Sequence, residues 1–109
     1  MNEKDKLIIS EFKNRLSPDL QCRVKRLIVF GSRVRGDAEE DSDLDVIALV
    51  DERATDIEKK LEDTAYQVMW DFDFKPFISL KVFSEEQFYD ALKKGFSFYQ
   101  HVEREGISL

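Results

Sequence analysis

Two short groups of residues in the middle of the chain could do chemistry together. Gly31 and Ser32 follow directly on an apolar run, and Asp43 and Asp45 stand at the start of the next apolar run. Residues two apart in a strand point to the same face, so both carboxylates would face one side of a sheet. Paired carboxylates hold hard cations such as Mg²⁺, which completes its shell with water and substrate phosphates. The pattern therefore indicates a site for phosphoryl or nucleotidyl transfer.

The residues around Gly31 suit the phosphate groups of such a substrate. Glycine has no Cβ, so the backbone can approach phosphate oxygens closely, and the Ser32 hydroxyl adds a donor. Arg33 and Arg35 carry planar guanidinium groups that could neutralise phosphate charge. A Gly-Ser turn or an Asp-x-Asp pair alone is most often a plain turn or a solvated loop. Their combination at two strand ends is much rarer by chance and favours a functional site.

The flanking sequence predicts the elements that must position these residues. Hydrophobic periodicity predicts three strands, at 24–30, 44–50 and 74–83. It predicts helices at 3–16, from Thr55, from Ser84 to Gly95, and at 97–105. Thr55 and Ser84 each begin a capping-box pattern, and Gly95 is a typical C-terminal cap. The order of these elements predicts an α/β (α+β) fold, a small mixed sheet flanked by helices.

Length and composition exclude several classes of protein. The 109 residues predict one domain, with a core at 24–84 and a C-terminal helical segment at 85–109. A net charge of -6 argues against non-specific binding of nucleic acid, because such binding depends on a basic surface that neutralises phosphates. The single cysteine cannot form an internal disulfide, and no apolar run is long enough to span a membrane. We expect a soluble cytoplasmic protein. We also expect that a partner supplies any large domain for substrate recognition.

The motif residues resemble those of a known superfamily. Gly31-Ser32, ten intervening residues and Asp43-Leu44-Asp45 match the G-S-x10-D-x-D signature of the DNA-polymerase-β-like nucleotidyltransferases. The segment from Phe30 to Gly36 and the short chain resemble the minimal nucleotidyltransferases of bacteria and archaea. The resemblance covers about residues 25–84.

This resemblance implies a nucleotidyltransferase fold and a set of ligands. Asp43 and Asp45 would bind divalent metal, usually Mg²⁺, and Gly31 and Ser32 would hold the phosphates of a nucleoside triphosphate. The chemistry would be transfer of AMP from ATP to a hydroxyl group. Many minimal members are antitoxins that pair with an all-helical HEPN-domain toxin, itself an RNase. They silence that toxin by binding it or by adenylylating a tyrosine on it.

One position departs from the superfamily pattern. Active members carry a third carboxylate on a following strand, and Ser79 occupies that position if residues 78–84 form the strand. Asp73 could take its place if the strand begins near Phe72. A hydroxyl is a weaker ligand and a poorer general base than a carboxylate. Two functions therefore stay open: a transferase, with Asp73 as the candidate third carboxylate, or a nucleotide-binding module that neutralises its partner by stoichiometric contact.

Three further features have a structural and a functional interpretation. Trp70, Phe72, Phe74 and Phe77 are predicted to pack in the core, and a partner or homo-oligomer surface is the alternative. Cys22 has no neighbouring cysteine or histidine and is predicted to be a small buried or half-buried residue. His101, the only histidine, is predicted to lie at the surface rather than to act in catalysis.

Overall fold

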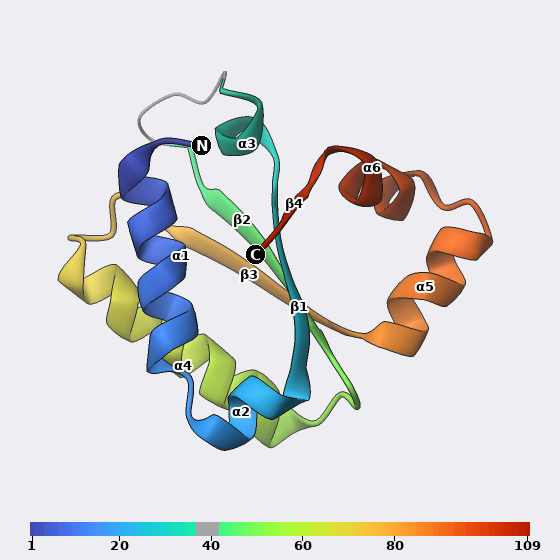
Figure 1. The fold of residues 1–109 in the computed structure, drawn as a ribbon, viewed down its shortest axis with the longest axis horizontal. Helices are drawn as coiled ribbons and strands as arrows, with labels where there is room; N and C mark the ends of the chain where they lie inside the picture. Colours follow the sequence, from blue (N-terminus) through green and yellow to red (C-terminus); the bar gives the residue numbers. More distant parts are fainter. Residues whose placement is uncertain (37–41) are drawn as a thin grey trace.

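The elements of the chain form a mixed sheet between two groups of helices, shown in Figure 1. The computed structural model describes residues 1–36 and 42–109. In chain order the elements are α1 (Glu3–Arg15), α2 (Pro18–Arg23), β1 (Val24–Phe30), α3 (Ser32–Arg35), β2 (Leu44–Val50), α4 (Thr55–Asp71), β3 (Ile78–Ser84), α5 (Glu85–Lys93), α6 (Ser97–Glu105) and β4 (Ile107–Ser108). The predicted fold class is confirmed. The helices of the described ranges are too short or too polar to cross a bilayer.

The strand order of the sheet brings the end of β1 and the starts of β2 and β3 to the same end of the sheet, called the edge below. The order is β3-β2-β1-β4, with β1 antiparallel to both β2 and β4, and with β2 parallel to β3. Parallel neighbours need a crossover connection, and α4 supplies it. Because β1 runs opposite to β2 and β3, the end of β1 meets the starts of β2 and β3. The residues that follow β1 and precede β2 are therefore neighbours in space.

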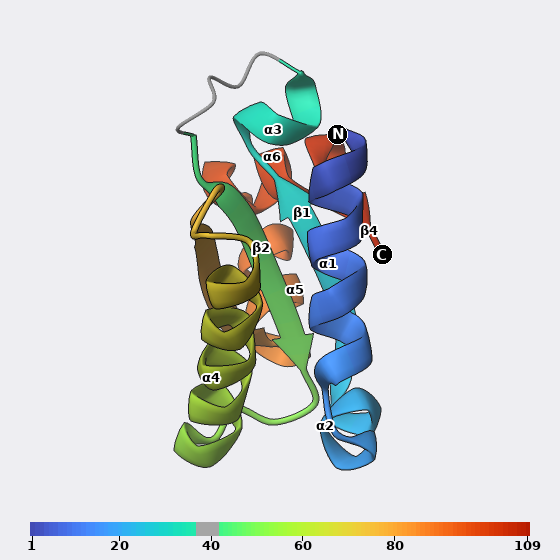
Figure 2. The same cartoon turned by 90° about the vertical axis from the view of Figure 1, so that its left-hand side faces the viewer.

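Alternation along β2 divides the core between the two faces of the sheet. Its even-numbered residues from Leu44 to Val50 pack with the apolar faces of α1 and α4. Ile47 and Leu49 pack on the other face, with residues of α5 and α6. Figure 2 shows α1 and α4 on one side of the strands, with α5 and α6 on the other. Burial on both faces explains why β2 is apolar at nearly every position, as its sequence predicts.

The helix ends agree with the predicted caps in part. The Ser84 hydroxyl caps α5 by accepting from the Gln87 amide at 3.1 Å, and Gly95 follows that helix with a φ of 80°. The prediction that Thr55 caps α4 is wrong, because Thr55 is already the first helical residue and Ala54 stands at the N-cap. Alanine has no side-chain acceptor, so a cap hydrogen bond from that position is not possible.

The third strand begins later than the sequence predicts. β3 starts at Ile78 rather than at 74, because the chain first folds back against the end of α4. The Phe74 amide donates to the Met69 carbonyl at 2.8 Å, and Asp73 and Phe74 both have positive φ values. The structure also contains α2, α3 and β4, which the sequence did not predict, since each is too short to show a periodicity of its own.

The predictions for the aromatic group, the cysteine and the histidine have different outcomes. Phe72 and Phe74 pack against the core, whereas Trp70 and Phe77 are 61% and 51% exposed. The core prediction is therefore wrong for the last two. Cys22 is exposed, so the prediction that it is buried or half-buried is also wrong. His101 lies at the surface, and its Nε2 lies 3.0 Å from Glu105 Oε2.

Candidate functional site

The two halves of the sequence motif meet at the edge where β1 ends and β2 begins. Phe30 is opposite Asp45 in the antiparallel pair, and Asp45 is opposite Ser79 in the parallel pair. A Cβ atom built on Gly31 would lie 2.6 Å from Asp45 Oδ2. The structure therefore brings Gly31, Asp45 and Ser79 together, although they are far apart in the sequence.

Gly31 is required by both its conformation and its surroundings. Its φ of 89° and ψ of -163° fall in a region that is accessible almost only to glycine. Its carbonyl accepts from the amides of Val34 and Arg35, which closes the short helix α3. Ser32 is the first residue of that helix and is half-buried. The tight turn thus places Ser32 directly after the glycine that lies against the Asp45 carboxylate.

The two aspartates differ in their exposure. Asp45 is half-buried on the face of the sheet that α5 and α6 cover, because it lies two residues before Ile47. Asp43 precedes the strand and is exposed. Burial raises the pKa of Asp45, Lys81 lowers it in part, and the negative charge of Asp43 raises it further. An unneutralised Asp45 carboxylate is therefore destabilised by its own site.

Lys81 is a residue that the sequence reasoning missed. It lies in β3 two residues after Ser79, on the same face of that strand. Its ammonium group acts on the Asp45 carboxylate and offsets part of the effect of burial. The alternation of β3 was the signal that could have identified it, once Ser79 was placed at the site.

The destabilised Asp45 carboxylate makes a prediction for the metal-free protein. Asp45→Asn should raise the midpoint of thermal unfolding by a few degrees at neutral pH, measured in excess chelator. A carboxylate whose folded pKa is raised destabilises the fold above that pKa and ceases to do so below it. The advantage of asparagine should therefore shrink as the pH falls through the raised pKa. Asp63→Asn, which removes an exposed carboxylate on α4, should leave the midpoint unchanged. A lower midpoint for Asp45→Asn at neutral pH would contradict the argument.

A third carboxylate does not join the aspartates within the described residues. Asp73 lies in the turn after α4, is exposed and precedes β3 by several residues. Among the residues of 1–36 and 42–109, no three side chains of the His, Cys, Asp or Glu type are grouped to hold a metal ion. Ser79, the residue predicted to stand at the position of the third carboxylate, is opposite Asp45.

The guanidinium of Arg33 contacts other parts of the protein rather than facing the proposed phosphate site. Its Nε lies 3.0 Å from Asp5 Oδ2 of α1, and the two side chains are 8% and 1% exposed. Its Nη1 also donates to the Ser42 carbonyl at 2.9 Å. This corrects the expectation that Arg33 neutralises phosphate, because the guanidinium is buried in contacts with the protein. Arg35, the other arginine of the turn, is exposed.

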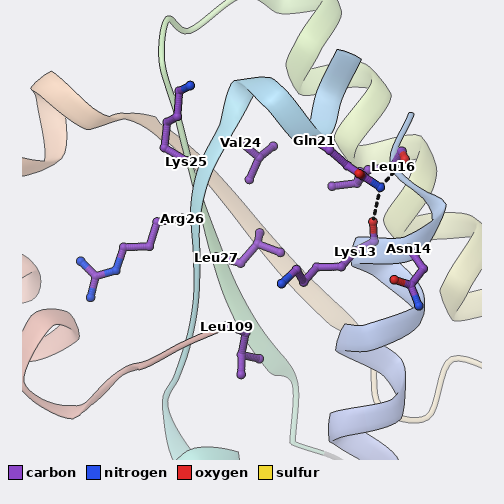
Figure 3. A pocket seen from close by; sticks show the side chains of 9 residues that line it. All are labelled: Lys13, Asn14, Leu16, Gln21, Val24, Lys25, Arg26, Leu27 and Leu109. Carbon is purple, nitrogen blue, oxygen red and sulfur yellow. Dashed lines mark hydrogen bonds between the residues drawn. The ribbon is translucent and has the colours of Figure 1, made fainter. Parts of the chain in front are cut away.

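A pocket described by the structure lies away from this edge. Figure 3 shows it between α1, α2 and the first half of β1, with Lys13, Leu27 and Leu109 among the residues that line it. Its volume is about 380 Å³. The described residues around it do not include Gly31, Asp45 or the other predicted site residues, so we do not assign the nucleotide to it.

Comparisons with known proteins find a family and two relatives for this chain. The family described as the nucleotidyltransferase domain matches residues 9–96. A candidate protein adenylyltransferase of Methanocaldococcus jannaschii is 36% identical over 105 residues, which are 94% of this chain and 95% of that protein. A second protein of the same organism and description is 43% identical over 51 residues, 47% of this chain and 49% of that protein.

A solved structure supports the fold. The crystal structure of a toxin–antitoxin with AMP-PNP contains a chain that matches with a TM-score of 0.55 and 17% identity. The match covers 99% of this chain and 72% of that chain. The fold, the apposition of Gly31 with Asp45 and the match over residues 9–96 lead to one conclusion: the chain belongs to the nucleotidyltransferase domain family.

Proposed function

We propose that this nucleotidyltransferase moves AMP from ATP to a hydroxyl group of a protein acceptor and depends on Mg²⁺. The observation that carries the proposal is the position of the Asp45 carboxylate, half-buried beside Gly31 and two residues from Asp43. The relative of 36% identity, named as a candidate protein adenylyltransferase, supports adenylyl transfer and a protein acceptor.

The residues present fit a divalent cation. Asp43 and Asp45 offer carboxylate oxygens, the ligands that Mg²⁺ prefers. Burial raises the pKa of Asp45, so a cation at this edge would relieve the cost of its negative charge. When bound, Mg²⁺ would neutralise phosphate charge and orient the attacking and leaving oxygens. We assign its binding to these two side chains.

The other residues of the edge would bind and orient the triphosphate. Gly31 lets the backbone of the turn pass beside the Asp45 carboxylate, where any Cβ would meet that carboxylate. The backbone amides of the turn could therefore approach phosphate oxygens closely. The Ser32 hydroxyl would donate to a phosphate oxygen, and the guanidinium of Arg35 would neutralise phosphate charge. The ammonium of Lys81, on the face that carries Asp45, adds a second cationic group for the reacting phosphate.

The acceptor that we propose is a toxin of the HEPN class, with this chain as its antitoxin in the cytoplasm. The fold match to a chain of a toxin–antitoxin structure supports a toxin as the partner. The HEPN class of that toxin is what the resemblance of the motif implies. The exposed rings of Trp70 and Phe77 offer apolar area for such a partner or for a second copy of the chain. Nucleic acid remains a poor acceptor for a chain with a net charge of -6.

Labelled nucleotide tests the proposed reaction. The protein is incubated with Mg²⁺, a HEPN-class toxin and ATP labelled on either the α- or the γ-phosphate. Transfer of AMP predicts that the toxin acquires the α label and not the γ label, because pyrophosphate leaves. Incorporation of the γ label would show phosphoryl transfer instead, and no incorporation of either would remove the proposed activity.

A second candidate function is neutralisation of the partner by stoichiometric binding. The observation that favours it is Ser79, which stands opposite Asp45 where a third carboxylate is expected. A site with two carboxylates can hold nucleotide and metal while its turnover is weak.

A single substitution tests whether Ser79 stands in the place of a missing third ligand. Ser79→Asp would add a carboxylate opposite Asp45, and the rate of AMP transfer should rise by roughly tenfold, equivalent to about 1.4 kcal/mol of barrier. The measurement is the initial rate of labelling at saturating Mg²⁺. Ser84→Asp, at the other end of the same strand, is the control for added charge. An unchanged rate in Ser79→Asp, or an equal rise in both variants, would count against a missing third ligand.

A further inference from the structure

The first turn of α1 carries a buried carboxylate that contacts the site motif. Asp5 is three residues after Asn2, whose side chain caps the helix by accepting from the Asp5 amide at 2.7 Å. Asp5 is 1% exposed, although charged side chains are seldom fully buried unless they are paired. Figures 1 and 2 both show this end of α1 beside α3. The helix thus places a negative charge behind the turn that follows β1.

The guanidinium of Arg33 joins this carboxylate to both sides of the motif. Arg33 belongs to α3, directly after Ser32, and its Nε lies 3.0 Å from Asp5 Oδ2. Its Nη1 donates to the carbonyl of Ser42 at 2.9 Å, and Ser42 directly precedes Asp43. One planar group therefore connects α1, the Gly31–Ser32 turn and the entry to β2. The rigid fork of arginine fixes such contacts in direction as well as in distance.

We propose that Asp5 is a positioning residue for nucleotide and metal binding, acting through Arg33. By holding Arg33, Asp5 sets where the Gly31–Ser32 turn lies relative to Asp43. The proposal rests on the proposed function, since it assigns nucleotide to the turn and metal to the aspartates. Asp5 is 28 residues from Arg33 in the sequence, and it needs no contact with substrate to act in this way.

The arrangement is costly for a contact that serves stability alone. Within the described part of the chain, Asp5 Oδ1 is buried without a hydrogen-bond partner. A buried ion pair with one unsatisfied oxygen is commonly no more stable than apolar side chains of similar size. The pair nevertheless gives a directional link to Ser42 that apolar side chains could not give. Its geometry therefore favours positioning of the site over packing.

Two substitutions separate the charge of the pair from its bridging geometry. Asp5→Asn keeps the size of the side chain and removes its charge. Arg33→Lys keeps the charge beside Asp5, but one ammonium cannot reproduce the fork between Asp5 and Ser42. Ile57→Val trims a buried side chain of α4 and serves as a control for a modest loss of stability.

The measurement is calorimetric binding of Mn²⁺ with a non-transferable ATP analogue, alongside amide NMR spectra of the metal-free protein. Asp5→Asn and Arg33→Lys should each weaken binding by roughly ten- to a hundredfold, as positioning contacts behind metal ligands do. The amide resonances of Ser32 and Asp43 should shift in both variants. Ile57→Val should bind within about twofold of the wild-type protein.

The outcomes distinguish this proposal from the proposed function. Unchanged amide resonances together with unchanged binding in Arg33→Lys would overturn the positioning role, even if Asp5→Asn failed to fold. Weakened binding in Ile57→Val to the same degree would also overturn it, because general destabilisation would then explain the effect. A wild-type protein that binds no nucleotide would remove the proposed function, while the shifts of Ser32 and Asp43 would still report whether Asp5 positions the motif.

Discussion

Replacing Asp43 and Asp45 together with asparagine should abolish transfer of labelled AMP by this protein, a loss of roughly a thousandfold or more. Asparagine has nearly the same size as aspartate but carries no charge, so both carboxylates assigned to the cation are lost while the packing around them is kept. The measurement is the rate of labelling of the acceptor from α-labelled ATP, with circular dichroism to confirm that the double variant is folded.

The control for this variant removes two carboxylates that lie away from the edge. Asp56→Asn with Asp63→Asn changes the net charge by the same amount on α4 and should retain full labelling. A double variant at Asp43 and Asp45 that still labels the acceptor would show that the assignment of the site is wrong. If it labels nothing but still inhibits the partner completely, binding rather than catalysis neutralises that partner.

Gly31→Ala adds one methyl group to the site, and we expect this substitution to lower both the stability of the fold and the binding of nucleotide. The new Cβ would lie 2.6 Å from Asp45 Oδ2, and the φ of 89° is strained for any side chain. Backbone strain of this kind costs about 1–3 kcal/mol, and the carboxylate must also move. The unfolding midpoint should fall, and nucleotide binding should be lost because the turn and the Asp45 carboxylate can no longer keep their places. Chemical denaturation and calorimetric titration measure the two effects.

Gly36 offers a matched control for the same substitution. It also has a positive φ, of 82°, but a Cβ built there meets no atom of residues 1–36 or 42–109 within 4 Å. Gly36→Ala should therefore lose only the stability that a left-handed backbone costs, and it should bind nucleotide as the wild-type protein does. Equal loss of nucleotide binding in the two variants would show that the contact with Asp45 is not what makes Gly31 necessary.

The parts of the molecule that the sequence predicts are those in which the deciding interactions join residues close together in the chain. The apolar runs of β1 and β2 predict both strands closely, and their ends identify Gly31 and Asp45 as neighbours. Ser84 was predictable as a cap because its hydroxyl acts on an amide three residues away. In each case the interaction that decides the structure lies within a few residues or within one strand pair.

The parts that were not predictable depend on contacts between distant segments. Asp5 is 28 residues from Arg33, so nothing near either residue in the sequence indicates that they pair. The arginine was therefore interpreted as a phosphate ligand. The apolar side chain of Phe74 indicates a strand, but the Phe74 amide donates to the Met69 carbonyl at the end of α4. This contact keeps Phe74 out of the sheet, so β3 begins later than its sequence indicates. Lys81 reaches the site only through the parallel register of β3 with β2.

The exposed thiol of Cys22 gives the molecule a natural attachment point. The residue lies in α2, just before β1 begins, whereas Gly31 follows the end of that seven-residue strand. The whole length of the strand separates the sulfur from the carboxylate edge. Because the chain has one cysteine, a maleimide dye would modify a single known position without mutagenesis. A fluorescent conjugate could then follow complex formation by anisotropy while the catalytic edge keeps its native side chains.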